Sequence, residues 1–592
     1  MDGGQGRDRP DAAPGPAAVP GPGIRDMDEA PLRAPTGRPV RRSTVDLDPI
    51  HRPDQEFSMR TVSGPADHVV VIGGGLAGLT AALYLTGAGR TVTVVERDGH
   101  VGGRVGRYRF ADYEIDSGAT VLTLPGLIDD ALAAVGTDRA SLVPPLRIRQ
   151  LAPAYHARFA DGSDIRVFTD VDLMSAEVAR VCGPAEAKRY RRLRDWLGRI
   201  YRAEFGEFMD TNFDSPLDMV WHRQKRAALG ELVRLGGFGR LGPRVRRFLR
   251  DPRLVRLFTF QALYAGMAPA EALAVYGAIP YMDTALGVYF PRGGMRAIAE
   301  AMAQAFTDAG GRLELGAEVT GIDYGPSTRP LGWGRGRARS VLLADGRKLP
   351  CEAVVLTADL GSLDRFGLRR RRWLRAAPSA VVAHGTVPVS VAETWPVQAH
   401  HSIEFGAAWD TTFAEITPRR GGRPMSDPSL LLTRPALSDP GLYIGRPDGR
   451  YEPFSLLVPC PNLDSAPLDW DRLGPAYLRE LLEGLERRGY RDIGTAFTVD
   501  RLDTPRTWQH RGMLAGTPFS AAHVFRQTGP FRTNNFPWTS ENVILAGCGT
   551  TPGVGVPTVL LSGKLAAQRI VGKNRTGRRR TIRMASGADA VD

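Results

Sequence analysis

The sequence has few cysteines and no long apolar run. Four cysteines occur among 592 residues, far apart, and none lies in a C-x-x-C or Cys/His cluster. This pattern argues against a disulfide framework or a cysteine metal site, so we expect four reduced thiols. No segment reaches the roughly 20 consecutive apolar residues that span a bilayer, and the N-terminus lacks the layout of a signal peptide. These absences predict a cytoplasmic protein without a transmembrane helix.

The rest of the composition is that of a globular chain with excess basic charge. Hydrophobic residues make up 43% and the formal net charge is +13. A chain of this length buries a large core and is expected to form more than one subdomain. The charge predicts attraction to something anionic, either nucleic acid or an acidic membrane surface.

The two ends of the chain differ from its middle. Residues 1–64 are crowded with Pro, Gly, Asp and Arg and show no periodicity, so we expect a disordered tail. Met59 stands at a suitable distance before the first strand to be the start codon, which leaves open whether residues 1–58 are translated. Residues 573–592 form a second polar, basic tail.

A β-α-β unit follows the first tail. Residues 68–72 and 91–96 are β-branched runs and residues 76–87 have a helical pattern. Farther on, residues 170–260 are mostly helical and rich in Arg, and residues 311–357 alternate short strands with turns. An amphipathic helix is predicted at 477–488 and a last strand at 542–546.

The junction of the first strand and helix carries the motif G-x-G-x-x-G. Gly73 permits the tight turn, Gly75 lets the backbone approach a pyrophosphate, and Gly78 allows close helix packing. The helix N-terminus, with Leu76 and Ala77, offers unpaired N–H groups and the positive end of a dipole. This pattern predicts a dinucleotide site.

An acidic residue stands where such a site needs one. Glu96 ends the second strand, and a carboxylate there accepts hydrogen bonds from ribose hydroxyls. Because FAD and NAD share the adenosine diphosphate half, these residues alone do not separate the two cofactors.

Three further segments resemble one flavoprotein family. Glu96-Arg97 followed by Gly102-Gly103-Arg104 is similar to the second glycine turn of the family that contains amine oxidases, protoporphyrinogen oxidase and carotenoid desaturases. In that family the turn and its Arg approach the diphosphate. Gly118-Ala119-Thr120 resembles the stretch that leads to the isoalloxazine ring, and Val319 occupies the position whose backbone contacts adenine.

The C-terminal element narrows the resemblance. Residues 541–557 and the following helix look like the signature of bacterial-type phytoene desaturases. Its N–H groups could stabilise negative charge on the reduced flavin's pyrimidine edge. Cys548 and Thr551 replace the Ala and His common in the family, and we expect Cys548 to be a small packing residue and not a redox thiol.

The resemblance covers residues 67–572 and implies an α/β fold. The implied fold combines a Rossmann-like FAD-binding domain of the glutathione-reductase/amine-oxidase type, a mixed α+β substrate domain and a helical membrane-associating insertion. The expected FAD-binding parts are 65–150, 291–375 and 536–572, the helical substrate and membrane region is 151–290, and the substrate domain is 376–535. The cofactor contacts expected from the motifs and the resemblance are Gly73, Gly75, Leu76, Ala77, Gly78, Glu96, Arg97, Gly103, Arg104, Gly118, Ala119, Thr120, Val319, Gly547, Gly549, Gly555 and Val556.

The family resemblance also implies a polyene substrate. A forty-carbon isoprenoid costs tens of kcal/mol to transfer into water, at about 0.8 kcal/mol per CH2, so the enzyme must collect it from a membrane. Residues 223–256 carry eleven Lys or Arg against two acids, with apolar residues interleaved. This stretch suits an anionic lipid surface, although a solvated basic helical face is the competing interpretation; nucleic acid is less favoured because no recognised module accompanies the charge. The aromatic residues expected to line the substrate path, each also eligible as simple core, are Phe258, Phe260, Tyr264, Tyr276 and Tyr281.

The leading hypothesis is an FAD-dependent carotenoid desaturase acting on phytoene at the inner face of a membrane, with quinone or oxygen as terminal acceptor. The catalytic base is not identified: Asp283, Glu404 and His510 are chemically eligible, and the flavin or water would serve equally. Open alternatives are a desaturase of modified carotenoids, a carotenoid oxidase or isomerase, and a saturase. A non-enzymatic lipid carrier with the same first-domain architecture is a further alternative.

Overall fold

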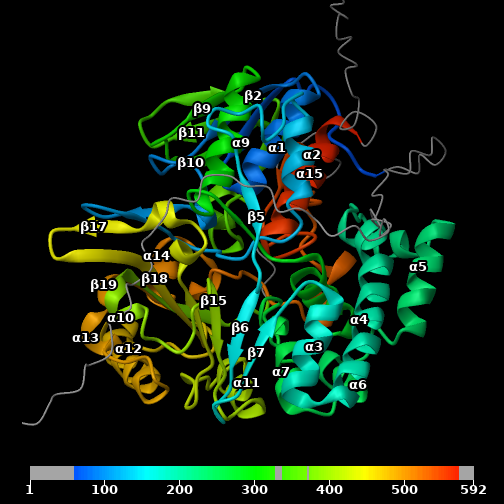
Figure 1. The fold of residues 1–592 in the computed structure, drawn as a ribbon. Helices are drawn as coiled ribbons and strands as arrows, with labels where there is room; N and C mark the ends of the chain where they lie inside the picture. The colour runs from blue at the N-terminus through cyan, green and yellow to red at the C-terminus, as the bar shows by residue number, and fades with distance from the viewer. Residues whose placement is uncertain (1–58, 327–335, 370–372, 573–592) are drawn as a thin grey trace, which may run out of the picture. The chain divides into compact units, whose positions relative to one another are not determined.

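The computed structural model describes residues 59–326, 336–369 and 373–572 (Figure 1). The tails predicted for residues 1–58 and 573–592 lie outside the described residues. Residues 59–64, which the sequence assigned to the disordered tail, instead pack against the body of the protein. The backbone N–H of Val62 donates to the carbonyl of Arg569 at 2.8 Å, and the Val62 side chain is buried. The buried Val62 side chain and this backbone hydrogen bond hold residues 59–64 against the rest of the protein.

A five-stranded parallel sheet has the order β20-β13-β1-β2-β9. Its β-branched strands are buried on both faces, as parallel sheets require. The strands predicted at 68–72, 91–96 and 542–546 are confirmed, the last two slightly shorter. The sheet joins both ends of the described chain. Its strands are β1 (His68–Ile72), β2 (Thr91–Val95), β9 (Arg312–Glu314), β13 (Ala353–Leu356) and β20 (Val543–Leu545).

Helices pack closely around this sheet. Helix α1 (Leu76–Gly87), predicted with the same bounds, contacts α15 (Val556–Val571) and α9 (Arg296–Asp308). Gly563 permits the first contact, because a Cβ there would lie 2.3 Å from the carbonyl oxygen of Ala77. Figure 1 shows these helices together with α2 (Gly126–Ala133).

Smaller sheets flank the parallel one. An antiparallel sheet of β10 (Val319–Tyr324), β11 (Ala338–Leu343) and β12 (Lys348–Pro350) lies between β9 and β13 in sequence. Strand β3 (Arg107–Arg109) pairs with β4 (Glu114–Asp116), and β5 (Ile148–Gln150) pairs with β8 (Tyr289–Pro291).

A larger mixed sheet has the order β19-β14-β18-β16-β15-β6-β7, with β17 on β18. Only the β15–β6 pair among them is parallel. The strands are β6 (Tyr155–Arg158), β7 (Asp164–Val167), β14 (Ser379–Pro388), β15 (His401–Glu404), β16 (Leu430–Thr433), β17 (Ile444–Arg446), β18 (Gly449–Cys460) and β19 (Thr498–Asp503).

The amphipathic helix predicted at 477–488 is longer than expected. Helix α12 runs from Trp470 to Arg487, and the Asp469 side chain caps it by accepting from the N–H of Arg472. Pro475 lies in the second turn of the helix, where its missing N–H costs one hydrogen bond. Other short helices here are α10 (Val389–Ala392), α11 (Asp410–Ile416), α13 (Ile493–Ala496) and α14 (Pro505–His510).

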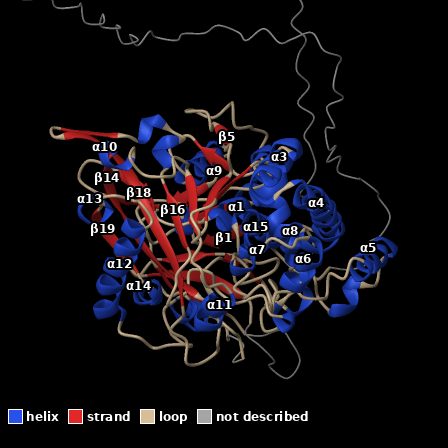
Figure 2. Cartoon of the chain, turned by 60° about the horizontal axis from the view of Figure 1, so that its bottom comes forward, coloured by secondary structure: helices blue, strands red, loops and turns tan. Residues whose placement is uncertain are grey.

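A helical region lies beside the sheets, as Figure 2 shows. It confirms the helical prediction for residues 170–260. Within the described residues, no helix combines the length and apolar character needed to cross a membrane. The helices are α3 (Val171–Cys182), α4 (Pro184–Glu204), α5 (Arg223–Arg234), α6 (Leu241–Phe248), α7 (Pro252–Leu257) and α8 (Ala278–Tyr281).

Candidate functional site

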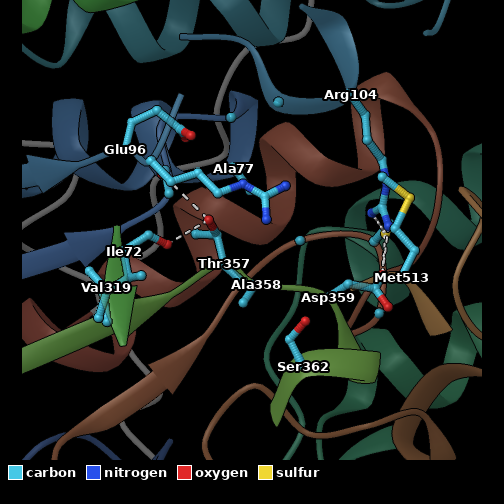
Figure 3. Close-up of a pocket in the computed structure, with 18 of the residues that line it drawn as sticks. Ile72, Ala77, Glu96, Arg104, Val319, Thr357, Ala358, Asp359, Ser362 and Met513 are labelled. Carbon is cyan, nitrogen blue, oxygen red and sulfur yellow. Dashed lines mark hydrogen bonds and ion pairs between the residues drawn. The ribbon is translucent and has the colours of Figure 1, made fainter. Parts of the chain in front are cut away.

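A pocket opens at the carboxyl ends of the parallel strands, where residues from both ends of the chain meet (Figure 3). This edge is where open α/β sheets bind ligands. Of the predicted cofactor contacts, those that line it are Gly73, Gly75, Leu76, Ala77, Glu96, Arg97, Gly103, Arg104, Val319, Gly547 and Gly549.

The two glycine turns touch each other at the pocket. The N–H of Gly102 donates to the carbonyl of Gly74 at 2.9 Å, and Gly75 and Gly102 form a parallel bridge. A Cβ on Gly103 would lie 3.3 Å from the Cα of Gly75. The absence of side chains therefore leaves backbone exposed to an incoming anion beside the N-terminus of α1.

Glu96 is held rigidly at the end of β2. Its carboxylate accepts from the N–H of Gly74 at 2.7 Å and from the N–H of Asp98 at 2.9 Å. These bonds fix the side chain in the pocket wall and leave acceptor capacity on both oxygens. Ribose hydroxyls are donors that fit this carboxylate.

Arg104 spans the pocket wall toward a different segment. Its guanidinium donates to Asp359 Oδ2 at 2.6 Å and contacts Cys548 Sγ at 2.6 Å, and Figure 3 shows the side chain directed toward Asp359. The other oxygen of Asp359 accepts from the N–H of Gly361 and of Leu514. The cation is thus fixed beside the pocket.

Cys548 is buried, as expected for a packing residue, but it also lines the pocket. Burial raises the pKa of its thiol, so the side chain stays protonated and contacts Arg104 as a neutral group.

Thr357 shapes the first glycine turn, and the sequence analysis missed it. Its hydroxyl donates to the carbonyl of Ile72 at 2.8 Å. A Cβ on Gly73 would lie 2.2 Å from Thr357 Oγ1, and Gly73 has φ +106°. The turn therefore admits only glycine. The position of Thr357 after the β-branched run 353–356 is the signal that could have revealed it.

Other pocket residues also escaped sequence reasoning because they lie in segments without a motif. Several of them lie in the segments that follow β13 and α14. They include Ala358, Asp359, Ser362, Arg511 and Met513.

Six predicted cofactor contacts lie outside the pocket lining, and two of them have evident packing roles. A Cβ on Gly78 would lie 2.0 Å from the carbonyl oxygen of Gly73, and one on Gly118 would lie 2.0 Å from that of Arg104. These glycines let the pocket segments approach one another. The six are Gly78, Gly118, Ala119, Thr120, Gly555 and Val556.

The loop before α15 is fixed by buried polar contacts. The Gly547 N–H donates to Ser562 Oγ at 3.0 Å. Arg532, fully buried, donates to the carbonyls of Thr550 at 2.8 Å and Cys548 at 2.5 Å. The loop thus presents a defined backbone to the pocket.

The five predicted substrate aromatics do not line this pocket. Phe258 is fully buried against Tyr190, and Phe260 packs edge-to-face against Tyr264. Tyr281 packs on Tyr201. Tyr276 is engaged in hydrogen bonds with His523 and Thr528.

The three eligible bases also lie away from the pocket lining. Burial raises the pKa of Asp283 to about 7, and its Oδ2 lies 3.3 Å from Tyr155 Oη. Burial raises the pKa of Glu404, which accepts from Tyr490 at 2.7 Å. His510 is exposed at the end of α14.

Comparison with known proteins identifies the class. The model of the flavin containing amine oxidoreductase family matches residues 76–441 and 472–571. A solved oxidoreductase from Methanosarcina mazei shares the fold, with TM-score 0.51 and 17% identity over 84% of this chain and 98% of that chain. The solved structure shows a shared fold, and the family model, which matches most of the chain, shows that the chain belongs to the flavin containing amine oxidoreductase family.

Relatives with similar sequences assign the chain to a narrower group within this family. The chain is 51% identical to a phytoene dehydrogenase of Streptomyces griseus, over 87% of this chain and 97% of the relative. It is 30% identical to a zeta-carotene-forming phytoene desaturase of Myxococcus xanthus, over 85% and 93%. The chain is a member of the phytoene desaturase and carotenoid desaturase family, which confirms the resemblance stated from its motifs.

Proposed function

We propose that this protein is an FAD-dependent desaturase that introduces double bonds into phytoene or a related carotenoid. The observation that carries the proposal is the 51% identity to a phytoene dehydrogenase along nearly the whole relative. The pocket supports it, because it combines the acidic, basic and side-chain-free elements that a flavin dinucleotide needs.

The described residues fit FAD part by part. The Gly73 and Gly103 turns and the N-terminus of α1 would hold the diphosphate, with Arg104 beside them. Glu96 would accept from a ribose hydroxyl, and Val319 would contact adenine. The loop from Gly547 to Gly555 would face the isoalloxazine ring.

Bound FAD supplies the hydride acceptor, and the protein supplies binding, orientation and exclusion of water. The substrate is apolar, so it offers few polar groups for recognition. The aromatic residues between α7 and β8, including Phe260, Tyr264 and Tyr281, would guide it toward the pocket. Quinone or oxygen would then reoxidise the flavin.

We further propose that the helical region docks on an anionic membrane surface. Five large apolar side chains are exposed in and beside α5, two of them within the basic 223–256 stretch and three just before it. Exposed apolar residues interleaved with cationic ones suit the lipid interface. The five are Leu217, Val220, Trp221, Val233 and Phe238.

The function is tested by coexpression with a phytoene-producing pathway, followed by chromatography of the pigments. The expected result is loss of phytoene and appearance of more unsaturated carotenoids. A Gly103→Val variant, which fills the contact between the two glycine turns, serves as the flavin-deficient control. Unchanged phytoene with folded, flavin-loaded wild-type protein would contradict the proposal.

A further inference from the structure

Arg511 connects two sides of the pocket. It follows α14, and the segment that it begins is fixed beyond the end of β13, where the N–H of Leu514 donates to Asp359 Oδ1 at 2.8 Å. The Arg511 side chain nevertheless reaches a residue beyond the end of β2, since its Nη2 lies 3.8 Å from Asp98 Oδ2. Arg511 and Asp98 both line the pocket.

The strand order shows what lies between these two sides. Strand β1 stands between β13 and β2 in the parallel sheet, so a side chain that joins the segments beyond those two strands spans the carboxyl end of β1. Two strand spacings amount to about 10 Å. The glycine turn from Gly73 to Gly75 occupies this end of β1 and lines the same pocket, and it is the turn assigned above to the diphosphate. Arg511 therefore stands where the adenosine diphosphate half of a dinucleotide would lie.

Most donors of the Arg511 guanidinium have no protein acceptor. Tyr108 Oη donates to the Asp503 carboxylate at 2.6 Å, and its oxygen accepts from Arg511 Nη1 at 3.3 Å. Among the described residues this is the one hydrogen bond that the guanidinium makes, because Asp98 lies beyond hydrogen-bond distance. A guanidinium carries five N–H donors, so a ligand can bind here without breaking a hydrogen bond of the protein.

Other arginines of the pocket differ from Arg511 in this respect. Arg104 lies 2.6 Å from the carboxylate of Asp359. Arg365 lies 2.8 Å from that of Glu318. The Arg511 side chain is 25% exposed, so its cation is open to the pocket and is not engaged by a carboxylate at hydrogen-bond distance. An anionic ligand in the pocket would supply the missing acceptor.

We propose that Arg511 is a further FAD-binding residue, which lies across the adenosine diphosphate half of the cofactor and donates to its phosphate and ribose oxygens. This rests on the proposed function, since it requires FAD in the pocket. Two N–H groups of one guanidinium match two oxygens of a phosphate group. The backbone of the glycine turns and the side chain of Arg511 then hold the same part of the cofactor from two distant segments of the chain.

The test measures the affinity of the full-length apoprotein for FAD, by flavin fluorescence, and for ADP, by competition with FAD. Arg511→Gln should weaken the binding of both by about tenfold, because the lost contact is charge-assisted and lies on the half that the two ligands share. Arg511→Lys keeps the charge with fewer donors and should lose about threefold for both. High salt should narrow the difference between wild type and Arg511→Gln. Arg506→Gln, at an exposed arginine of α14, makes the same change in net charge and should bind both ligands as wild type does.

Each outcome bears on one of the two proposals. If Arg511→Gln binds both ligands as tightly as wild type, or loses affinity for FAD alone, Arg511 does not contact the shared half and the inference is wrong. If Arg506→Gln loses as much affinity as Arg511→Gln, net charge is responsible and the inference is also wrong. If wild-type protein does not bind FAD, the proposed function itself fails. Thermal melting of each apoprotein controls for folding, and if Arg511→Gln does not fold, an Arg511→Lys protein with wild-type melting decides by whether it binds both ligands more weakly.

Discussion

Arg104 donates to Asp359 at 2.6 Å although 255 residues separate them in sequence. The Asp359 side chain is almost fully buried and that of Arg104 is about one-third exposed, with exposed fractions of 6% and 32%. Asp359 also accepts from two backbone N–H groups. A single carboxylate thus ties the second glycine turn to the segment after β13 and orients the cation at the pocket.

This pair predicts coupled effects on FAD affinity. Arg104→Ala should weaken FAD binding by about tenfold or more, because it removes a charge-assisted contact. Asp359→Asn should weaken it less, through misorientation of Arg104. The double variant should resemble Arg104→Ala, since Asp359 acts through the arginine. Equilibrium dialysis measures the four affinities, and strictly additive losses would contradict the coupling. Arg347→Ala, at the exposed pair with Asp345, is the control and should leave affinity unchanged.

Alanine substitutions at Gly73 and Gly89 distinguish the cost of a steric clash from the cost of backbone strain. Both have positive φ, +106° and +82°, but a Cβ on Gly73 meets Thr357 Oγ1 at 2.2 Å, whereas nothing lies within 4 Å of one on Gly89. Gly89→Ala should cost about 1 kcal/mol of unfolding free energy from strain alone. Gly73→Ala should cost about 3 kcal/mol or more and abolish FAD retention.

Chemical denaturation and flavin content measure both glycine variants. In the double variant Gly73→Ala/Thr357→Ala the clash is removed, so the part of the unfolding free energy lost to the clash should be recovered. The part lost to backbone strain should remain. If Gly73→Ala and Gly89→Ala lose equal unfolding free energy, the clash between the new Cβ and Thr357 is relieved without cost, which would contradict the prediction.

Asp283 predicts a dependence of stability on pH. Burial raises its pKa to about 7, above the value of about 3.9 for an unfolded chain. The folded state therefore binds more protons than the unfolded state between these values, and this contribution to stability falls as pH rises from about 4 to 7. Asp283→Asn removes the ionisation, so the variant should be more stable than wild type at pH 8 by about 4 kcal/mol, and similar to it near pH 4.

Melting temperatures measured from pH 4 to 8 test the Asp283 prediction. Asp345→Asn is the control, because Arg347 beside Asp345 lowers the pKa of that carboxyl, so its ionisation contributes no slope in this range. The same pH trend in Asp283→Asn as in wild type would mean that Asp283 titrates normally.

The sequence predicted the parts of the site that a local pattern encodes. The glycine turns and Glu96 stand at fixed offsets from a β-branched strand, so their place at a sheet edge follows from one β-α-β unit. Thr357 and Asp359 meet the pocket only through tertiary contacts, and no local period marks them. The helix α12 was predicted too short because Pro475 obscures its first turns. The aromatic residues were recognised as apolar, but composition does not distinguish a core contact from a substrate contact, as Phe258 illustrates.

The membrane proposal predicts a loss of binding that depends on both charge and apolar surface. Arg223, Arg226 and Arg234 are exposed on α5. Each basic residue near an anionic surface contributes about 1 kcal/mol, so replacing all three by Gln should weaken binding to vesicles containing anionic phospholipid by about a hundredfold. Val233→Ser, at a side chain that is 62% exposed, should weaken binding further even at high salt, because its contribution is apolar.

Vesicle cosedimentation at two salt concentrations measures these effects, with zwitterionic vesicles as the lipid control. A triple variant of exposed arginines elsewhere, Arg419→Gln, Arg420→Gln and Arg472→Gln, carries the same change in net charge. If both triple variants lose binding equally, the net charge of the protein governs the interaction and α5 is not the docking element. Selective loss for the α5 variant, with retained flavin content, would place the lipid contact on the helical region through which an apolar substrate would enter.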